Sequence, residues 1–267
     1  MSARQRATSS ALLERPTLLA LALASSAALI SSLAAAAGVP EAPLVRLAVV
    51  LVAWAALGGL VAFSFTPGFD LPWRAIRRVP GARSVALTFD DGPHPDTTPA
   101  LLAALRRARV RATFFLVGEA VERWPHLARQ IAADGHAVGN HTQRHRLLTF
   151  RTAAQIAEEV AACQRALARV DVDARLFRPP HGFKPLGLHR VLRRHKLRLV
   201  VWQGSIRDTD APGTSTIIER AVALAGTGRI LLLHDHPRCG DQTVRAVPSI
   251  IERYRALGYA FVAIDEP

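Results

Sequence analysis

One short stretch, Thr88-Phe89-Asp90-Asp91-Gly92-Pro93, joins the end of an apolar run to two adjacent carboxylates and a turn. The run over residues 84–89 alternates large apolar side chains with smaller ones, which predicts a buried strand. Two like charges at the end of a buried strand are unfavourable unless a cation or a hydrogen-bond donor compensates them. A metal ion would bind one carboxylate and leave the other as a base, whereas a turn or a helix cap explains the pair equally well.

Outward from this stretch, apolar or β-branched runs alternate with amphipathic stretches. The expected strands are residues 85–89, 112–117, 137–140, 176–178, 197–202, 230–233 and 260–264. The expected helices are residues 98–108, 120–133, 153–168, 188–194, 215–225 and 244–257. This alternation predicts a parallel α/β fold in the form of a barrel, in which chemistry gathers at the carboxyl ends of the strands.

The composition limits the partners. The chain has 267 residues and a formal net charge of +13, nearly all of it from arginine. Such a charge favours an anionic polymer or lipid surface, although an arginine-rich composition alone would also produce it. No zinc finger, helix-turn-helix or aromatic-basic motif is present, so we expect no nucleic-acid binding.

Two uncharged runs, residues 17–40 and 47–69, precede the α/β region. Each exceeds the roughly 20 residues that a membrane-spanning helix needs. A signal peptide is the alternative for the first run, and two core helices are the alternative for both. The expected division is a cytoplasmic tail over 1–16, a two-helix transmembrane anchor over 17–66, a linker over 67–83 and a catalytic domain over 84–267.

Arginines flank the two runs on both outer sides. The positive-inside rule therefore predicts a multi-pass protein of the inner or cytoplasmic membrane, with membrane lipid as a partner and the catalytic domain in the cytoplasm. Long domains can cross a membrane regardless of this bias, which leaves an outward-facing domain as the alternative. Nothing in the sequence indicates an obligate protein partner.

The segment His141-Thr142-Gln143-Arg144-His145 follows the third expected strand. Histidines four residues apart face the same way on a helical turn, and this spacing suits Zn²⁺. Together with Asp91 they supply three protein ligands, which is the pattern of a catalytic zinc site with one open position. The alternative is a pair of surface histidines.

Further polar candidates follow the later strands. Arg178 precedes two prolines that stiffen its turn; an arginine there either holds a carboxylate ionised and oriented or forms a surface salt bridge. His234 follows a fully apolar run and suits a general acid, because imidazole titrates near neutrality. His236 lies further into the same loop. Asp208, beyond Trp202, either orients a catalytic histidine or caps a turn.

Taken together, five blocks in order resemble the polysaccharide deacetylase family, the NodB-type enzymes of carbohydrate esterase family 4. The blocks are residues 88–93, 141–145, 178–182, 202–208 and 232–234, and the resemblance covers residues 84–264. The resemblance implies a distorted (β/α)7 barrel and a divalent metal ion, usually Zn²⁺.

The resemblance also implies roles for individual residues. Asp91, His141 and His145 would bind the metal, and Asp90 would act as the general base. Arg178 would steady Asp90, while Asp208 would orient His234 as the general acid. The implied substrate pocket comprises Leu232, Pro180, His181 and Trp202, and a backbone N–H near His181 would hold the oxyanion.

The implied reaction is hydrolysis of an N-acyl group, in particular N-acetyl, from an amino sugar in a polysaccharide or a lipid-linked glycan. One alternative is a deformylase or an amidohydrolase acting on another non-peptide C–N bond. The other is a non-catalytic, membrane-anchored glycan-binding protein, although such a protein commonly loses the base, the acid or a ligand. His181, Ser205 and Thr209 stand where the family often has Tyr, Asp and Trp, which affects the expected substrate contacts more than the metal site.

Overall fold

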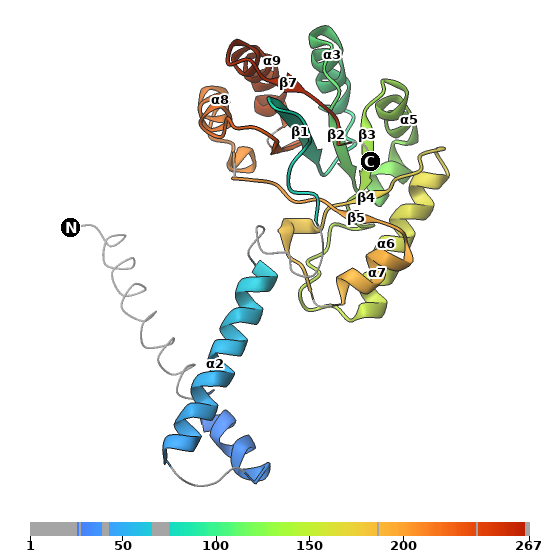
Figure 1. Cartoon of the computed structure of the whole chain (residues 1–267). Helices are drawn as coiled ribbons and strands as arrows, with labels where there is room; N and C mark the ends of the chain where they lie inside the picture. Colours follow the sequence, from blue (N-terminus) through green and yellow to red (C-terminus); the bar gives the residue numbers. More distant parts are fainter. Residues whose placement is uncertain are drawn as a thin grey trace, which may run out of the picture. The chain divides into compact units, whose positions relative to one another are not determined.

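A computed structural model of the chain describes residues 26, 28–38, 43–65, 75–185, 187–204, 206–238 and 240–264. The chain divides into two compact units, Met1–Ala62 and Phe63–Pro267 (Figure 1). Ser205 and the expected tail over residues 1–16 lie outside the described residues.

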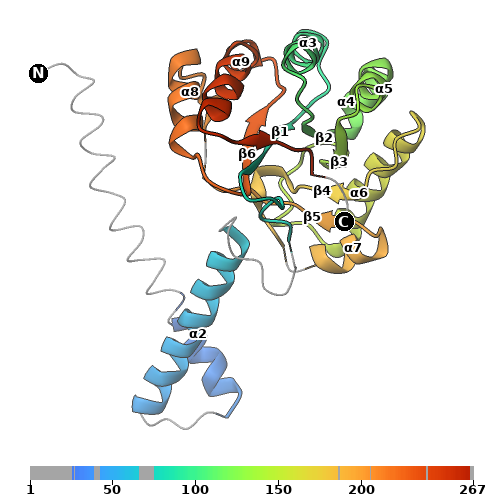
Figure 2. The same cartoon turned by 45° about the horizontal axis from the view of Figure 1, so that its top comes forward.

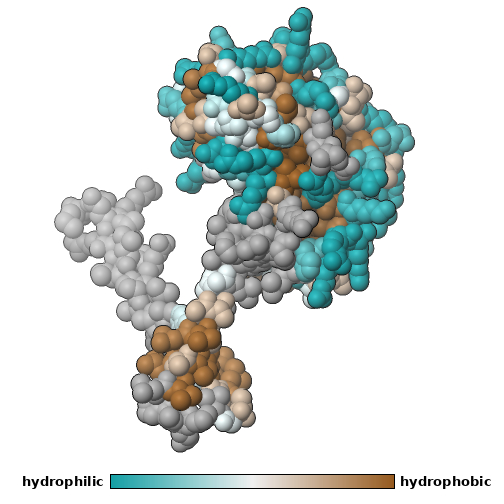
Figure 3. All heavy atoms as spheres, in the orientation of Figure 1, coloured by the Kyte–Doolittle hydropathy of each residue, from teal (hydrophilic) through white to brown (hydrophobic). Residues whose placement is uncertain are grey.

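The first unit contains helical residues 28–36 and most of helix α2 (Pro43–Phe65). Several large apolar side chains of these helices are exposed (Figure 3): Leu29, Leu33, Val45, Leu47, Leu51 and Val52. Within the described residues, however, no helix combines the length and the apolar character that a bilayer crossing requires.

The predicted transmembrane anchor over residues 17–66 is therefore unsupported, and the predicted multi-pass membrane localisation, with its orientation, is wrong. The prediction rested on the length of two uncharged runs, which does not determine where a helix begins or ends.

The second unit is a curled, parallel half-barrel of the α/β class, consistent with a distorted (β/α)7 barrel (Figure 2). Its strands are β1 (Ser84–Asp90), β2 (Thr113–Leu116), β3 (Ala137–Asn140), β4 (Leu176–Phe177), β5 (Arg198–Leu199), β6 (Arg229–His234) and β7 (Ala260–Phe261). Their order is β5-β4-β3-β2-β1-β6, and β7 pairs with β1. Every pair is parallel, as the alternating sequence pattern predicts.

Helices follow the strands along the chain and cover the outside of the sheet (Figure 2). They are α3 (Thr98–Ala108), α4 (Gly118–Arg123), α5 (Pro125–Ala133), α6 (Ala153–Ala168), α7 (Leu188–Arg194), α8 (Thr214–Ala223) and α9 (Gly240–Ala256). Two short 3-10 turns, η1 (Pro180–Gly182) and η2 (Asp208–Asp210), lie in loops. The helix expected over 120–133 is divided at Trp124, because Pro125 cannot continue the hydrogen bonding of α4.

The core lies between β1 and the helices that cover it. All seven residues of β1 are buried. Phe89 packs on Phe114 of β2 with ring centroids 5.1 Å apart, and Leu101 and Leu105 of α3 are completely buried in the same cluster. Because β1 sits at the centre of this core, the carboxylates at its end have a rigid support.

Residues 76–79 contribute to the wall of the barrel, although they precede β1. Ile76 forms a parallel bridge beside β5, and the Val79 N–H donates to the carbonyl of Gly228 just before β6 at 3.0 Å. The Gln203 side chain hydrogen-bonds both to this segment and to β6. The segment thus lies between β5 and β6, the two strands at the ends of the sheet order.

Candidate active site

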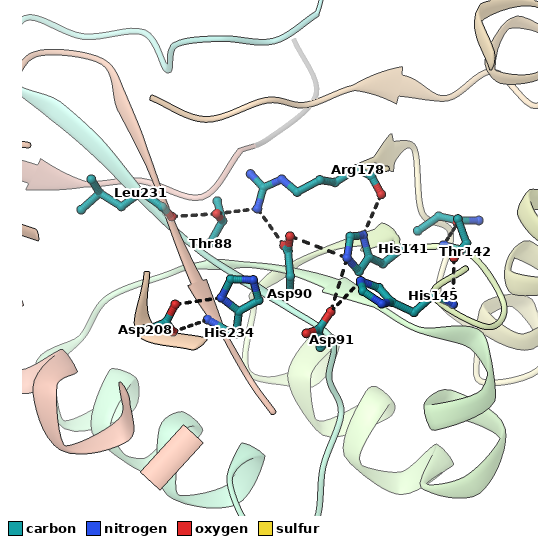
Figure 4. Close-up of polar contacts among 11 residues, drawn as sticks. Thr88, Asp90, Asp91, His141, Thr142, His145, Arg178, Asp208, Leu231 and His234 are labelled. Atoms are coloured by element: carbon teal, nitrogen blue, oxygen red, sulfur yellow. Dashed lines mark hydrogen bonds and ion pairs between the residues drawn. The ribbon is translucent and has the colours of Figure 1, made fainter. Parts of the chain in front are cut away.

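The polar side chains singled out in the sequence meet at the carboxyl ends of the strands (Figure 4). Asp90 ends β1 and is the direct neighbour of His234, which ends β6. Asn140 of β3 pairs with Phe177 of β4, so His141 and Arg178 follow side by side. Parallel strands present their carboxyl ends at one edge, which is why residues distant in sequence converge here.

Asp91, His141 and His145 form a cluster whose potential ligand atoms all lie within 4.8 Å of one another. Asp91 Oδ1 is 3.5 Å from His141 Nε2 and 3.2 Å from His145 Nε2. Two ligands at the usual distances from a tetrahedral Zn²⁺ lie about 3.4 Å apart. Asp91 Oδ1 is also buried without a hydrogen-bond partner among the described residues. The cluster therefore fits a metal ion.

The protonation of the cluster suits metal binding as well. Burial raises the pKa of the Asp91 carboxyl, but His141 and His145 more than offset this effect and hold that pKa well below its usual value. Burial, together with the nearby His141, lowers the pKa of His145 to about 4. A carboxylate and a neutral imidazole are the forms that bind a metal.

Hydrogen bonds to the backbone orient these ligands. His141 Nδ1 is 2.7 Å from the carbonyl oxygen of Arg178, so the neutral ring donates from Nδ1 and leaves Nε2 facing Asp91. His141 and His145 lie in a loop, not on the helical turn that their spacing suggests. Positive φ angles at Thr142 (67°) and His145 (51°) fold this loop, so that the ring centroids of His141 and His145 lie 4.9 Å apart.

Asp90 is held by a fully buried arginine. The Arg178 Nη1 group donates to Asp90 Oδ1 at 2.7 Å and to Thr88 Oγ1 at 2.8 Å. The guanidinium also lies over the Phe115 ring, 4.1 Å from its centroid. This geometry rules out the alternative of a surface salt bridge. With Oδ1 bound by Arg178, Asp90 Oδ2 lies 3.7 Å from His141 Nε2.

Asp208 and His234 form a second buried pair. Asp208 Oδ1 is 2.8 Å from His234 Nδ1, and Asp208 Oδ2 accepts from the His234 N–H and from Thr243 Oγ1. Burial acts to lower the pKa of His234, but the hydrogen bond and charge of Asp208 prevail and raise it to about 9. The imidazole therefore carries a proton at neutral pH, and its orientation leaves Nε2 available to donate.

A cavity of about 460 Å³ opens on the cluster. It is lined by Asp91, Val117, His145, His181, Thr209, His236 and Arg238. Arg238 and the supporting hydroxyls of Thr88 and Thr243 were missed in the sequence. The only sequence signal for Arg238 is its position in the loop that follows His234.

The other expected pocket residues lie beside this cavity lining, not in it. Pro180 and Leu232 are buried, and the Trp202 ring lies 5.4 Å from the Arg178 guanidinium. A Cβ atom on Gly182 would stand 2.5 Å from Trp202, and the φ of Gly182 is +75°. Only glycine therefore lets this turn approach the indole ring.

The cluster fits a metal ion and lies beside a buried carboxylate and a buried Asp–His pair at one edge of a parallel half-barrel, which is the arrangement expected of a metal-dependent hydrolase.

Comparison with known proteins specifies the family. The family model described as Polysaccharide deacetylase matches residues 77–200. The chain is 33% identical over 184 residues to the peptidoglycan-N-acetylglucosamine deacetylase of Bacillus cereus (strain ATCC 14579), covering 68% of this chain and 86% of the relative. It is 36% identical over 202 residues to the chitooligosaccharide deacetylase of Bradyrhizobium sp. (strain ANU 289), covering 73% and 92%.

A solved structure agrees with these relatives. The family 4 carbohydrate esterase from Streptomyces lividans, in complex with acetate, superposes with a TM-score of 0.65 and is 33% identical, over 69% of this chain and 94% of that one. The chain belongs to the polysaccharide deacetylase family, carbohydrate esterase family 4, and is a hydrolase of non-peptide carbon–nitrogen bonds.

Proposed function

We propose that this protein removes N-acetyl groups from amino sugars within a glycan polymer, using a divalent metal held by Asp91, His141 and His145. The observation that carries the proposal is the convergence of this cluster with Asp90 and His234 at one edge of the barrel. The B. cereus and Bradyrhizobium relatives are named for two different glycans that share an N-acetylated amino sugar.

Zn²⁺ suits the two imidazoles and one carboxylate of the cluster. When bound, the ion supplies a Lewis acid that polarises the amide carbonyl and acidifies water. The histidines provide neutral nitrogen ligands, and His141 is kept in the required tautomer by the Arg178 carbonyl. Asp91 supplies the negative charge of the ligand set.

Asp90 acts as the general base in this proposal. Arg178 binds Asp90 Oδ1, which leaves Oδ2 to accept a proton from the attacking water. The water oxygen bonds to the amide carbon, and the carbonyl oxygen becomes an oxyanion. A backbone N–H of the η1 turn at His181 would donate to that oxygen. Arg178 keeps Asp90 in position throughout, since both groups are buried.

His234 acts as the general acid. Its Nδ1 is bound to Asp208, so the proton for the leaving amine comes from Nε2. Protonation of the nitrogen breaks the C–N bond and releases the free amine and acetate. Asp208 keeps its negative charge and orients the ring. Leu232, Pro180 and Trp202 would surround the acyl group. The small pocket that they form would accept an acetyl group and exclude larger acyl groups.

The contacts among Asp90, Asp91, His141, His145, Arg178, Asp208 and His234 support the catalytic proposal over the alternative of a non-catalytic glycan-binding protein. A deformylase would use the same residues but would act on an N-formyl group and release formate in place of acetate.

The test is to incubate the purified full chain with N-acetylated chitin and peptidoglycan oligosaccharides. We expect release of acetate, a matching loss of acetyl mass from the sugar, inhibition by a chelator and recovery with Zn²⁺. Release of formate from an N-formyl sugar, with none of acetate, would instead support the deformylase. No release of either acid by the zinc-loaded protein would contradict the proposed function.

A further inference from the structure

The cavity beside the metal cluster has an unusual electrostatic lining. Among the described residues that line it, Asp91 is the one carboxylate, and the other polar residues are hydrogen-bond donors or cations: His145, His181, Thr209, His236 and Arg238. Once Asp91 binds a metal, its charge is compensated by the ion. The remaining lining then favours a negatively charged group.

Other carboxylates near this wall are already engaged. Asp208 is bound to His234, and Asp210 pairs with Arg207 at 2.9 Å. Asp235 is buried and accepts hydrogen bonds from the hydroxyls of Thr97 and Thr98. Because these three carboxylates are hydrogen-bonded or ion-paired to other residues, they do little to neutralise the charge of Arg238.

Arg238 is exposed at the cavity wall, and no carboxylate among the described residues forms an ion pair with it. Its backbone N–H donates to His236 Nδ1 at 3.2 Å, which leaves the proton of the neutral ring on Nε2. Burial lowers the pKa of His236, which keeps the ring in that neutral form. Arg238 therefore presents a charged donor at the cavity wall, beside the ring of His236.

Thr209 and His181 line the same cavity. Thr209 is a small residue that follows Asp208 on η2, and His181 is an exposed ring packed 4.9 Å from His145. Both residues therefore line the same cavity as Arg238, beside the metal cluster.

We propose that Arg238 forms a subsite for a carboxylate carried by the glycan on the sugar next to the reacting one. This inference rests on the proposed function and specifies its substrate. Guanidinium groups bind carboxylates with charge-assisted hydrogen bonds, and a neutral glycan offers no such group. The substrate class is an acidic amino-sugar polymer, such as one bearing lactyl ether carboxylates, in preference to neutral chitin oligomers.

The test compares one peptidoglycan tetrasaccharide in two forms, with its lactyl carboxylates free or converted to neutral amides. The readout is the ratio of kcat/KM for acetate release from the acid form to that from the amide form. We expect a ratio of about ten or more for the unmodified chain, from the usual strength of a charge-assisted hydrogen bond. Arg238→Gln should bring the ratio close to one, and added salt should reduce it.

Arg129→Gln is the matched control, because Arg129 is an exposed arginine on α5 that does not line the cavity. It should keep the ratio of the unmodified chain. Equal rates on the two forms in the unmodified chain, or a ratio that Arg238→Gln does not change, would overturn the subsite and leave the deacetylase proposal standing.

A binding measurement covers the case in which neither form releases acetate, which would count against the proposed function itself. Calorimetric titration of each tetrasaccharide into the zinc-loaded Asp90→Asn variant, with and without Arg238→Gln, measures the subsite without turnover. About tenfold tighter binding of the acid form that is lost with Arg238→Gln supports the subsite. Equal affinities for the two forms overturn it.

Discussion

The site has an Asp91 side, with His141 and His145, and an Asp208 side, with His234 and Thr243. The two sides differ in how many of their carboxylate oxygens accept hydrogen bonds. On one side, Asp91 Oδ1 is buried beside two imidazoles and accepts no hydrogen bond from the described residues. On the other side, both oxygens of Asp208 accept hydrogen bonds, from His234 and from Thr243. Both carboxylates are largely shielded from water, yet among the described residues hydrogen-bond donors reach both oxygens of Asp208 and none reaches Asp91 Oδ1.

This difference indicates that Asp91 needs a metal ion to compensate its charge, whereas Asp208 is already compensated by hydrogen bonds. A buried carboxylate without a donor is unfavourable unless something else binds it, so the Asp91 side is built to be completed by an ion. Asp208 already has its hydrogen bonds, and in the proposed mechanism it holds a proton on His234. Mutations on the two sides should therefore have different effects: metal loss on the first, and an altered pH dependence on the second.

The largest effect is expected from His145→Ala. Removing one of three ligands should reduce bound zinc from about one ion per chain to a small fraction, and acetate release should fall about 10³-fold or more, since catalysis needs the ion. Elemental analysis of the dialysed protein measures the metal directly. Unchanged zinc content would refute the assignment of His145 as a ligand and remove the contrast between the two sides.

Asp90→Asn should be nearly as damaging to turnover but should leave the metal in place. Loss of a general base typically reduces the rate by about 10²–10⁴-fold. Asn can still accept a hydrogen bond from Arg178, so the variant should fold, which thermal unfolding would verify. A variant that keeps its zinc and also keeps its full rate would show that Asp90 is not the base.

Asp208→Asn should change the pH profile. Asp208 raises the pKa of His234, and a general acid works only while it is protonated, so activity falls as the pH rises through that pKa. Without the charge of Asp208 the pKa of His234 drops, and the alkaline limb of kcat/KM should move to lower pH. Zinc content should stay as in the unmodified chain. An alkaline limb at the same pH in both proteins would contradict the role of this pair.

The smallest effect is expected from Thr243→Val. The change removes the hydroxyl that donates to Asp208 Oδ2 at 2.8 Å but leaves the donation from the His234 N–H. Loss of one such bond typically lowers the free energy of unfolding by about 1–2 kcal/mol. Denaturant unfolding measures this loss, and zinc content serves as the control. Loss of zinc in this variant would show that the two sides are not independent.

The order of strands and helices could be predicted, because apolar runs alternate regularly with amphipathic stretches. The carboxylates after Phe89 were informative for a physical reason, namely that a buried strand seldom ends in two charges. The split of one expected helix at Trp124 was signalled by Pro125, whose effect on α4 is a local property of the chain.

Other features depend on the folded chain and could not be predicted. The spacing of His141 and His145 suggested a helical turn, but a loop with positive φ angles brings the same two rings together. The sequence indicated Arg178 as a partner of Asp90, but its complete burial between Asp90 and aromatic rings is a property of the folded chain. Arg238 faces the site only because β6 ends beside β1.

The wall segment over residues 76–79 has a consequence for how the protein is made. The Gln203 side chain hydrogen-bonds to the Arg77 carbonyl, 126 residues away in the sequence. The Arg78 side chain hydrogen-bonds to the Thr227 carbonyl, 149 residues away. In a chain that emerges from the ribosome amino end first, this segment can pair with residues beside β5 once these are made, but its bonds to Thr227 and Gly228 must wait until the start of β6 has been synthesised. We expect the barrel to complete its fold late in translation, and a recombinant fragment that starts at Ser84 to leave an open seam between β5 and β6.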